Sequence, residues 1–215
     1  MSTRNRQLID LGDFEEVLGS QGFTAICGTD EVGRGPLAGP VVAAAVIMPE
    51  GVVIDGLDDS KKLSAAKRDE LFDIIAELGI PCAVGIIDHE TIDTINILQA
   101  SLMAMRKAIM DLPQCPDVIL VDGTHTIPNI HQPQYAIISG DSRCRAIMAA
   151  SVVAKVTRDR IMDEYQKLYP NFSFSVHKGY PTPMHLRELD QHGPCDIHRK
   201  SFKPVAKYLQ TYALL

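Results

Sequence analysis

Short apolar runs alternate with longer amphipathic stretches along this chain of 215 residues, and this pattern predicts an α/β fold. Apolar runs bounded by Gly, Pro or Asp predict five strands, at residues 24–29, 41–48, 82–87, 118–121 and 135–138. Apolar residues spaced three or four positions apart predict helices near residues 65–78, 89–111, 145–168, 183–191 and 204–212. Strands that alternate with helices in this order indicate a mixed sheet flanked by helices.

The connections between these elements indicate the domain organisation. A short, Gly-rich connection between the first two strands predicts an antiparallel hairpin. Ser64 and Asp88 precede predicted helices and are typical N-cap residues. No linker is long enough to separate two independent domains. We therefore expect an N-terminal arm at residues 1–22, an α/β domain at residues 23–170, and a small helical C-terminal segment at residues 171–215 packed on it.

Composition places the chain among ordinary globular proteins, with 46% hydrophobic and 22% charged residues. No apolar run approaches the roughly 20 residues that a membrane-spanning helix needs. The five cysteines are scattered without a Cys-x-x-Cys pair, which favours reduced, mostly buried thiols over a disulfide or zinc framework. We expect a cytoplasmic, monomeric protein that does not enter a membrane.

The net charge of −6 is unevenly distributed along the chain. Residues 1–142 contain 9 Lys or Arg against 21 Asp or Glu, a balance of −12, whereas residues 143–207 contain 12 against 6, a balance of +6. An acidic part that adjoins a basic part suits a protein that holds cations at one place and a polyanion at the next. Clustering of charges on solvated faces is the equally acceptable alternative.

Four carboxylates lie at or near the ends of predicted elements: Asp30, Glu31, Asp122 and Asp141. Ligands gather at strand ends in α/β sheets, and like charges held close together demand a raised pKa or a cation. Carboxylate oxygens suit Mg²⁺ or Mn²⁺ rather than zinc. Each residue alone is better explained as a cap or a turn, so the metal hypothesis rests on the set.

Two conditions apply to this metal hypothesis. Neighbouring residues on a strand point to opposite faces, so Asp30 and Glu31 can share one site only if the strand ends or bulges there. Asp159, in the middle of the long helix, competes with Asp141 for the fourth position, but its flanking Arg residues favour a surface or inter-element salt bridge.

The segment after these carboxylates, Gly33-Arg34-Gly35, nearly matches a phosphate-binding P-loop that begins at Gly28. The match fails because Arg34 replaces the Lys, Gly35 replaces the Ser or Thr, and Pro36 follows. A nucleoside-triphosphate hydrolase is therefore excluded as an interpretation.

Six motifs occur in an order that resembles a known family, the type 2 ribonucleases H represented by bacterial ribonuclease HII. They are DEVGRGP at residues 30–36, DSKKLS at 59–64, VDG at 121–123, GDS at 140–142, AASVVAKVTRD at 149–159 and HKGYPT at 177–182. Any one of these motifs is a weak signal, but together they are specific and cover nearly the whole chain from about 24 to 205.

The resemblance implies a ribonuclease H-like fold and cleavage of RNA paired to DNA. It assigns the metal ligands and catalytic carboxylates to Asp30, Glu31, Asp122 and Asp141. It also implies that Gly33, Arg34 and Gly35 recognise the 2′-hydroxyl of the ribonucleotide. This hydroxyl is the group that distinguishes RNA from DNA. Tyr180 matches a tyrosine that packs on the neighbouring deoxyribose. Candidates for phosphate contacts are Lys61, Lys62, Lys155 and Lys178.

Several residues carry alternative interpretations. Tyr180 suits a turn aromatic packed on the core, and Lys155 suits an ordinary solvated side chain. Arg143 and Arg145 suit either a phosphate contact or a pairing with the carboxylates. The histidines at 185, 192 and 198 lack metal-ligand spacing and are interpreted as surface or capping residues, whereas His177 is expected to face nucleic acid.

We predict a metal-dependent endoribonuclease that cuts the RNA strand of RNA–DNA hybrids and cuts 5′ of ribonucleotides embedded in duplex DNA. Two Mg²⁺ or Mn²⁺ ions are expected, with 3′-hydroxyl and 5′-phosphate products. The alternatives are a junction resolvase of the same fold and a non-catalytic hybrid-binding protein. The tail at residues 210–215 loosely resembles a sliding-clamp-binding peptide, although an amphipathic terminal helix explains it more simply.

Overall fold

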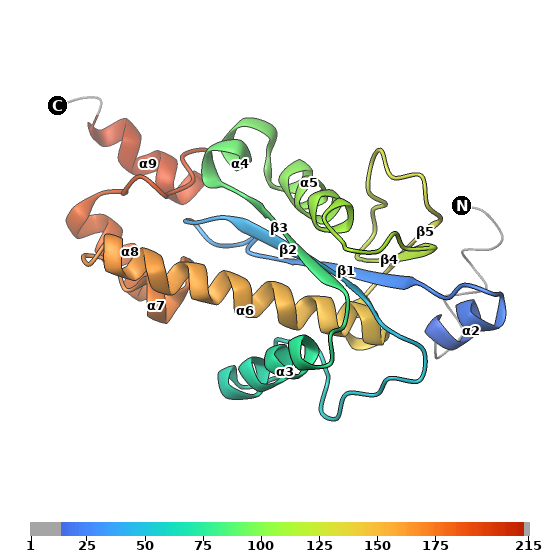
Figure 1. Ribbon diagram of the computed structural model, residues 1–215. Coiled ribbons are helices and arrows are strands. Elements are labelled where there is room, and N and C mark those ends of the chain that lie inside the picture. Colours follow the sequence, from blue (N-terminus) through green and yellow to red (C-terminus); the bar gives the residue numbers. More distant parts are fainter. Residues whose placement is uncertain (1–13, 213–215) are drawn as a thin grey trace.

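A five-stranded mixed sheet forms the centre of the computed structural model, which describes residues 14–212, with side chains described to residue 209 (Figure 1). The strand order is β3-β2-β1-β4-β5. The strands are β1 (Ile26–Val32), β2 (Val41–Ile47), β3 (Cys82–Ile87), β4 (Val118–Asp122) and β5 (Gln134–Ile137). β1 pairs antiparallel with β2 and parallel with β4, which confirms both the predicted hairpin and the mixed sheet.

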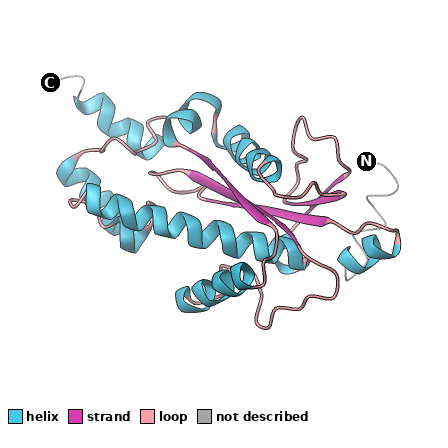
Figure 2. Cartoon of the chain, in the orientation of Figure 1, coloured by secondary structure: helices cyan, strands magenta, loops and turns pink. Residues whose placement is uncertain are grey.

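Helices cover both faces of this sheet (Figures 1 and 2). One face carries α4 (His89–Ile95) and α5 (Ile97–Met110), whose apolar residues pack on Cys27, Ala43 and Val121. The other face carries α3 (Ala65–Glu77) and α6 (Arg145–Leu168). The N-terminal α2 (Phe14–Ser20) packs on that second face, beside the start of α6. Burial of apolar surface in these layers is the main force that holds the fold together.

The expected continuous helix over residues 89–111 is wrong, because the chain breaks at Asn96. Asn96 adopts φ 69°, a left-handed conformation that ends α4. Its side chain accepts hydrogen bonds from the N–H groups of Leu98 and Gln99, so the same residue caps α5. The predicted caps at Ser64 and Asp88 are confirmed, with their side chains accepting from Lys67 N–H and Thr91 N–H.

The C-terminal part lies across the far end of α6 and against the loop that joins β1 to β2. It contains α7 (Phe174–His177), α8 (Pro183–His192) and α9 (Lys203–Tyr212). Leu37 and Ala38 of the β1–β2 loop share one buried cluster with Phe174 and Leu189. The division of the chain into three parts stays a prediction, and most of the expected arm at residues 1–22 lies outside the described residues.

Two further expectations concern cysteines and membranes. All five cysteines are free thiols, as predicted, but only Cys27 and Cys144 are fully buried, and Cys115 is exposed. Across residues 14–212, none of the helices combines the length and the apolar character needed to cross a bilayer.

Three histidines of the C-terminal part are buried, which corrects the expected surface and nucleic-acid-facing roles. His185 Nε2 lies 3.0 Å from His198 Nε2, and both side chains are inaccessible to solvent. His177 stacks on His185 with ring centroids 4.2 Å apart and bonds Glu188. The burial of these histidines cannot be predicted from the sequence, because the three residues lie up to 21 positions apart and meet only in the folded chain. His192 is exposed, as expected.

This histidine pair is arranged for neutral rings. His185 Nδ1 donates to the Tyr180 carbonyl oxygen, and His198 Nδ1 accepts from the Cys195 N–H. The proton of His198 therefore sits on Nε2 and is donated to His185 Nε2. Protonation of His185 would set two N–H groups against each other. Burial, followed by the charge of His177, lowers the pKa of His185 to about 4, and burial, followed by the charge of His185, lowers the pKa of His198 to about 3.

We expect the protein to lose stability in mild acid through this pair. The histidines have a pKa near 6.5 in the unfolded chain and a much lower pKa in the folded protein, so below pH 6.5 the unfolded chain binds more protons. The stability that the neutral histidines contribute above pH 6.5 is therefore lost as the pH falls from about 6.5 toward 4. The expected loss is about 2 kcal/mol for each histidine between pH 7.5 and 5.0, and so about 4 kcal/mol for the pair. Urea unfolding at both pH values measures it. His185→Asn should roughly halve the pH dependence, because His198 remains buried, and His192→Asn should leave it unchanged.

Candidate active site

Strand register brings Asp30 and Asp122 side by side. β1 and β4 are parallel, and Thr29 pairs with Val121, so the next residue on each strand is one of these carboxylates. Both side chains point to the face covered by α6, because they share the alternation of Ile26 and Leu120 on that face. β1 does not end at Asp30 as expected. It continues to Val32 through regular pairing with β2.

Asp141 joins this pair from the short helix η1 (Gly140–Ser142), which follows β5. The turn depends on Ser139 in a left-handed conformation at φ 55°. Asp122 Oδ1 accepts hydrogen bonds from Gly140 N–H at 2.8 Å and from Asp141 N–H at 3.4 Å, which fixes η1 against the strand end. One carboxylate oxygen each from Asp30, Asp122 and Asp141 lies within 4.8 Å of the others.

The three carboxylates suit a divalent cation on electrostatic grounds. Asp30 is only 5% exposed, and burial, followed by the charges of Glu31 and Asp122, raises its pKa well above the ordinary value. Burial and the charge of Asp141 also raise the pKa of Asp122. The Lys61 ammonium lies 2.7 Å from Asp141 Oδ2 and supplies positive charge at this place. A cluster of hard oxygen ligands that already attracts the Lys61 ammonium suits Mg²⁺ or Mn²⁺.

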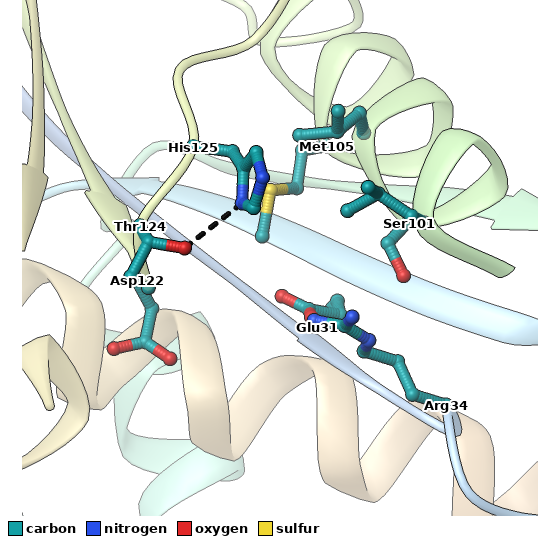
Figure 3. A pocket seen from close by; sticks show the side chains of 10 residues that line it. Glu31, Arg34, Ser101, Met105, Asp122, Thr124 and His125 are labelled. Carbon is teal, nitrogen blue, oxygen red and sulfur yellow. Dashed lines mark hydrogen bonds and ion pairs between the residues drawn. The ribbon is translucent and has the colours of Figure 1, made fainter. Parts of the chain in front are cut away.

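Glu31 lies on the opposite face of the sheet from Asp30, because the strand neither ends nor bulges between them. Its carboxylate bonds Arg34 at 3.0 Å. Burial, opposed by Arg34, raises the pKa of Glu31. Figure 3 shows Glu31 and Asp122 on the wall of one pocket of about 160 Å³. The structure therefore brings three of the four predicted carboxylates together, with Glu31 reaching the same region from the α5 side.

The Gly-Arg-Gly segment begins one residue after β1 ends. Gly33 is buried at φ 97°, and a Cβ there would lie 2.3 Å from Arg158 Nε, so the protein interior itself requires glycine. Arg34 and Gly35 are exposed. A Cβ at Gly35 would lie 3.5 Å from the Tyr180 ring, which places Tyr180 beside this segment. Tyr180 is 38% exposed and is therefore not a core aromatic.

The four predicted phosphate-binding lysines differ in their surroundings. Lys61 and Lys62 are exposed, with Lys62 paired to Asp58. Lys155 and Lys178 are mostly buried and form ion pairs with Asp159 and Asp163. Asp159 also lies 3.8 Å from an Arg68 nitrogen, which confirms the inter-element salt bridge expected for it.

Sequence reasoning missed several residues of this region. The Ser60 and Ser151 hydroxyls are buried and bond each other at 2.7 Å next to Asp30, and Ser151 lowers the pKa of that carboxyl. Thr124 and His125 line the pocket beside Glu31 and bond each other at 2.9 Å (Figure 3). Their position directly after the VDG motif was the available signal. Arg143, left open between two roles, stacks over the Phe14 ring.

Comparison with known proteins identifies the family. A family model described as Ribonuclease HII matches residues 27–205. The chain belongs to the ribonuclease HII family. It is 51% identical over 199 residues to a ribonuclease HII of Geobacter metallireducens, with 93% of each chain covered. It is 50% identical over 190 residues to one of Caldicellulosiruptor saccharolyticus, covering 88% of this chain and 92% of the relative.

Solved structures agree on the fold. The ribonuclease H2 of Pyrococcus horikoshii superposes with a TM-score of 0.73 at 23% identity, covering 87% of this chain and 98% of that one. A ribonuclease HIII solved in complex with Mn²⁺ superposes with a TM-score of 0.65 at 17% identity, covering 89% and 71%. Like other members of the ribonuclease HII family, the chain is a metal-dependent endoribonuclease that acts on RNA–DNA hybrids. The predicted family, fold and enzyme class are confirmed.

Proposed function

We propose that this ribonuclease HII also cuts duplex DNA on the 5′ side of a single embedded ribonucleotide, leaving 3′-hydroxyl and 5′-phosphate ends. The observation that carries the proposal is the continuity of β1 with the Gly-Arg-Gly segment. β1 pairs regularly with β2 up to Val32, and Gly33 follows directly, so only two residues separate Asp30 from the Gly-Arg-Gly segment and the carboxylate cluster is held close to the exposed Arg34 and Gly35. Recognition of one sugar is thereby linked to the place of bond cleavage.

Asp30, Asp122 and Asp141 would hold a divalent cation, and Glu31 is the fourth proposed ligand and catalytic carboxylate. With two Mg²⁺ or Mn²⁺ ions held by these carboxylates, the site would be able to activate a water molecule and to stabilise the charge on the leaving 3′-oxygen. The carboxylates also keep this end of the sheet negative, so that a nucleic-acid backbone is repelled until cations are present.

Recognition of the ribonucleotide is assigned to backbone groups of Gly33, Arg34 and Gly35. Backbone N–H groups can donate to a 2′-hydroxyl that DNA lacks, and the absent side chain at Gly35 permits close approach. Tyr180, which lies beside Gly35, offers a ring face to the adjacent deoxyribose.

Phosphate contacts are assigned first to the exposed Lys61 and Lys62, which give affinity without sequence preference. Lys155 and Lys178 need to leave Asp159 and Asp163 before they can contact phosphate, so we propose them as secondary contacts.

A sliding-clamp contact is a separate proposal. A ribonuclease HII of Archaeoglobus fulgidus has been solved in complex with PCNA. The clamp-like tail of the present chain, residues 210–215, lies outside the residues whose side chains the structure describes. The monomeric state and the cytoplasmic location also stay predictions.

The test uses two DNA duplexes of one sequence, of which one carries a single ribonucleotide. We expect cleavage of that duplex alone, on the 5′ side of the ribonucleotide, only when Mg²⁺ or Mn²⁺ is added. Gel mapping of labelled ends measures the position. Cleavage in excess chelator would overturn the metal-dependent mechanism. Cleavage of an RNA–DNA hybrid without cleavage of the single-ribonucleotide duplex would overturn the proposed incision.

A further inference from the structure

Two arginines of the C-terminal half are fully buried around the Gly-Arg-Gly segment. Arg158 belongs to the motif at residues 149–159, whereas Arg199 lies in none of the six family motifs. Arg199 and Arg158 are both 0% exposed. Arg199 donates to the carbonyl oxygens of Gly33 at 2.6 Å, Arg34 at 3.2 Å, Pro36 at 2.8 Å and Gly39 at 2.9 and 3.0 Å. All these guanidinium bonds reach backbone more than 150 residues away in the sequence. One side chain therefore fixes nearly the whole β1–β2 loop.

Arg199 is suited to this task by its donor geometry. Five guanidinium N–H donors in one plane match several carbonyls, whereas an ammonium offers three donors from one point. Within residues 14–209, its hydrogen bonds go to backbone carbonyls and none goes to a carboxylate. Burial, together with the charge of Arg158, lowers the pKa of Arg199 to about 9, so the cation persists at neutral pH. The charge of Asp93 favours this buried cation, but the hydrogen bonds of the guanidinium go to four carbonyl oxygens of the β1–β2 loop, so the loop conformation depends on Arg199.

The bonds to the carbonyl oxygens of Gly33 and Arg34 determine where the N–H groups of the next two residues, Arg34 and Gly35, point. In a trans peptide, the C=O and the next N–H point in opposite directions. Because the carbonyls of Gly33 and Arg34 turn inward to Arg199, the N–H groups of Arg34 and Gly35 turn away from it. These two N–H groups belong to exposed residues, and neither donates to another described group.

We propose that Arg199 is a positioning residue for ribonucleotide recognition, which orients the Arg34 and Gly35 N–H groups toward the 2′-hydroxyl. This inference rests on the proposed reading of that hydroxyl by the Gly-Arg-Gly segment. Arg199 touches neither the substrate nor the metal ligands. Arg199 keeps the Gly33–Arg34 and Arg34–Gly35 peptide planes from rotating. Little conformational entropy of the loop is then lost when the substrate binds.

Arg158 provides a matched control from the same interior. It is equally buried and also bonds only carbonyl oxygens, those of Pro40, Ala38 and Lys178. None of these belongs to the two peptide planes that precede the Arg34 and Gly35 N–H groups. A substitution that removes the hydrogen bonds of Arg158 should therefore destabilise the part of the β1–β2 loop near Ala38 and Pro40. It should leave the peptide planes before Arg34 and Gly35 in their orientation.

The experiment compares Arg199→Lys, Arg158→Lys and the unaltered enzyme, with active enzyme counted by titration. Two constants are measured: kcat/KM for the single-ribonucleotide duplex, and the inhibition constant of the all-DNA duplex of the same sequence. For Arg199→Lys we expect kcat/KM to fall at least about tenfold, the size of one lost hydrogen bond. The inhibition constant should stay within about twofold, since phosphate contacts are untouched. Arg158→Lys should change the ratio of the two constants by less than about twofold.

A merely structural role would lower the amount of active enzyme and leave both constants unchanged, which overturns the proposal. An equal loss of selectivity in Arg158→Lys overturns it as well, because loosening of the loop would then be general. If Arg199→Lys does not fold, the neutral Arg199→Gln, which keeps two amide donors, is measured instead, and failure of both to fold makes Arg199 a folding residue only. If the unaltered enzyme does not cut the single-ribonucleotide duplex, the proposed function fails before this inference is reached.

Discussion

Asp122→Asn should lower metal-dependent cleavage by roughly 10³-fold while leaving the fold intact. An Asp122 oxygen lies within 4.8 Å of oxygens of Asp30 and Asp141, so loss of its charge removes one of the proposed cation ligands. Charge stabilisation by a bound metal is worth several kcal/mol, and each 1.4 kcal/mol is tenfold in rate. The amide oxygen of Asn can still accept from Gly140 N–H and Asp141 N–H, so η1 should stay in place. Single-turnover rates on an RNA–DNA hybrid measure the effect.

Stability measurements separate loss of metal from loss of fold. In chelator, Asp122→Asn should unfold at the same temperature or higher, because like-charge repulsion with Asp30 and Asp141 is relieved. Added Mn²⁺ should raise the melting temperature of the unaltered protein and not of the variant. Asp117→Asn is the matched control, since Asp117 precedes the opposite end of β4 and bonds Thr24 and Ala25. Full cleavage activity in Asp122→Asn would show that the site assignment is wrong.

Gly28→Ala should reduce the free energy of unfolding by about 3 kcal/mol or more. A Cβ at Gly28 would lie 2.2 Å from the Ala146 carbonyl carbon and 2.3 Å from Ile147 N. Both are backbone atoms of α6, so relief requires the helix to move away from the sheet. Because α6 carries Ser151 next to Asp30, the same shift should also slow cleavage. Urea unfolding and hybrid cleavage by the same preparation measure the two effects.

Gly19→Ala is the matched control for this substitution. Gly19 lies in α2, and nothing is within 4 Å of a Cβ built there. Alanine is the better helix former, so this variant should be more stable by roughly 0.5–1 kcal/mol. An unchanged unfolding free energy in Gly28→Ala would show that α6 does not approach β1 as closely as the structure has it.

Local patterns predicted most of the elements correctly because their causes are local. The long helix α6 begins at Arg145 and ends at Leu168 as predicted, before Pro170, and Ser64 caps α3. The break at Asn96 was missed because apolar spacing continues across it while the backbone turns left-handed at one residue. Apolar periodicity reports which face is buried and carries little information on a single dihedral angle.

The candidate site divides in the same way. Asp30, Asp122 and Asp141 were predicted from carboxylates near element ends and from family motifs, and the register Thr29↔Val121 gives the reason that two of them meet. The strand could be expected to end or bulge at Asp30, yet pairing with β2 carries it to Val32. That pairing turns Glu31 to the other face of the sheet. The dipeptide Asp-Glu by itself does not show whether a strand continues through it or ends there.

The order of the elements, the family motifs and the candidate cation-binding carboxylates follow from the sequence alone, because these depend on residue type and short spacing. Only the tertiary structure decided which groups are buried and which distant residues meet. Arg199 reaches the carbonyl of Gly33 across 166 positions, and His185 meets His198 in a solvent-free interior. Such contacts arise from packing of whole elements, and burial then changes the chemistry of side chains that are polar and solvated in the unfolded chain.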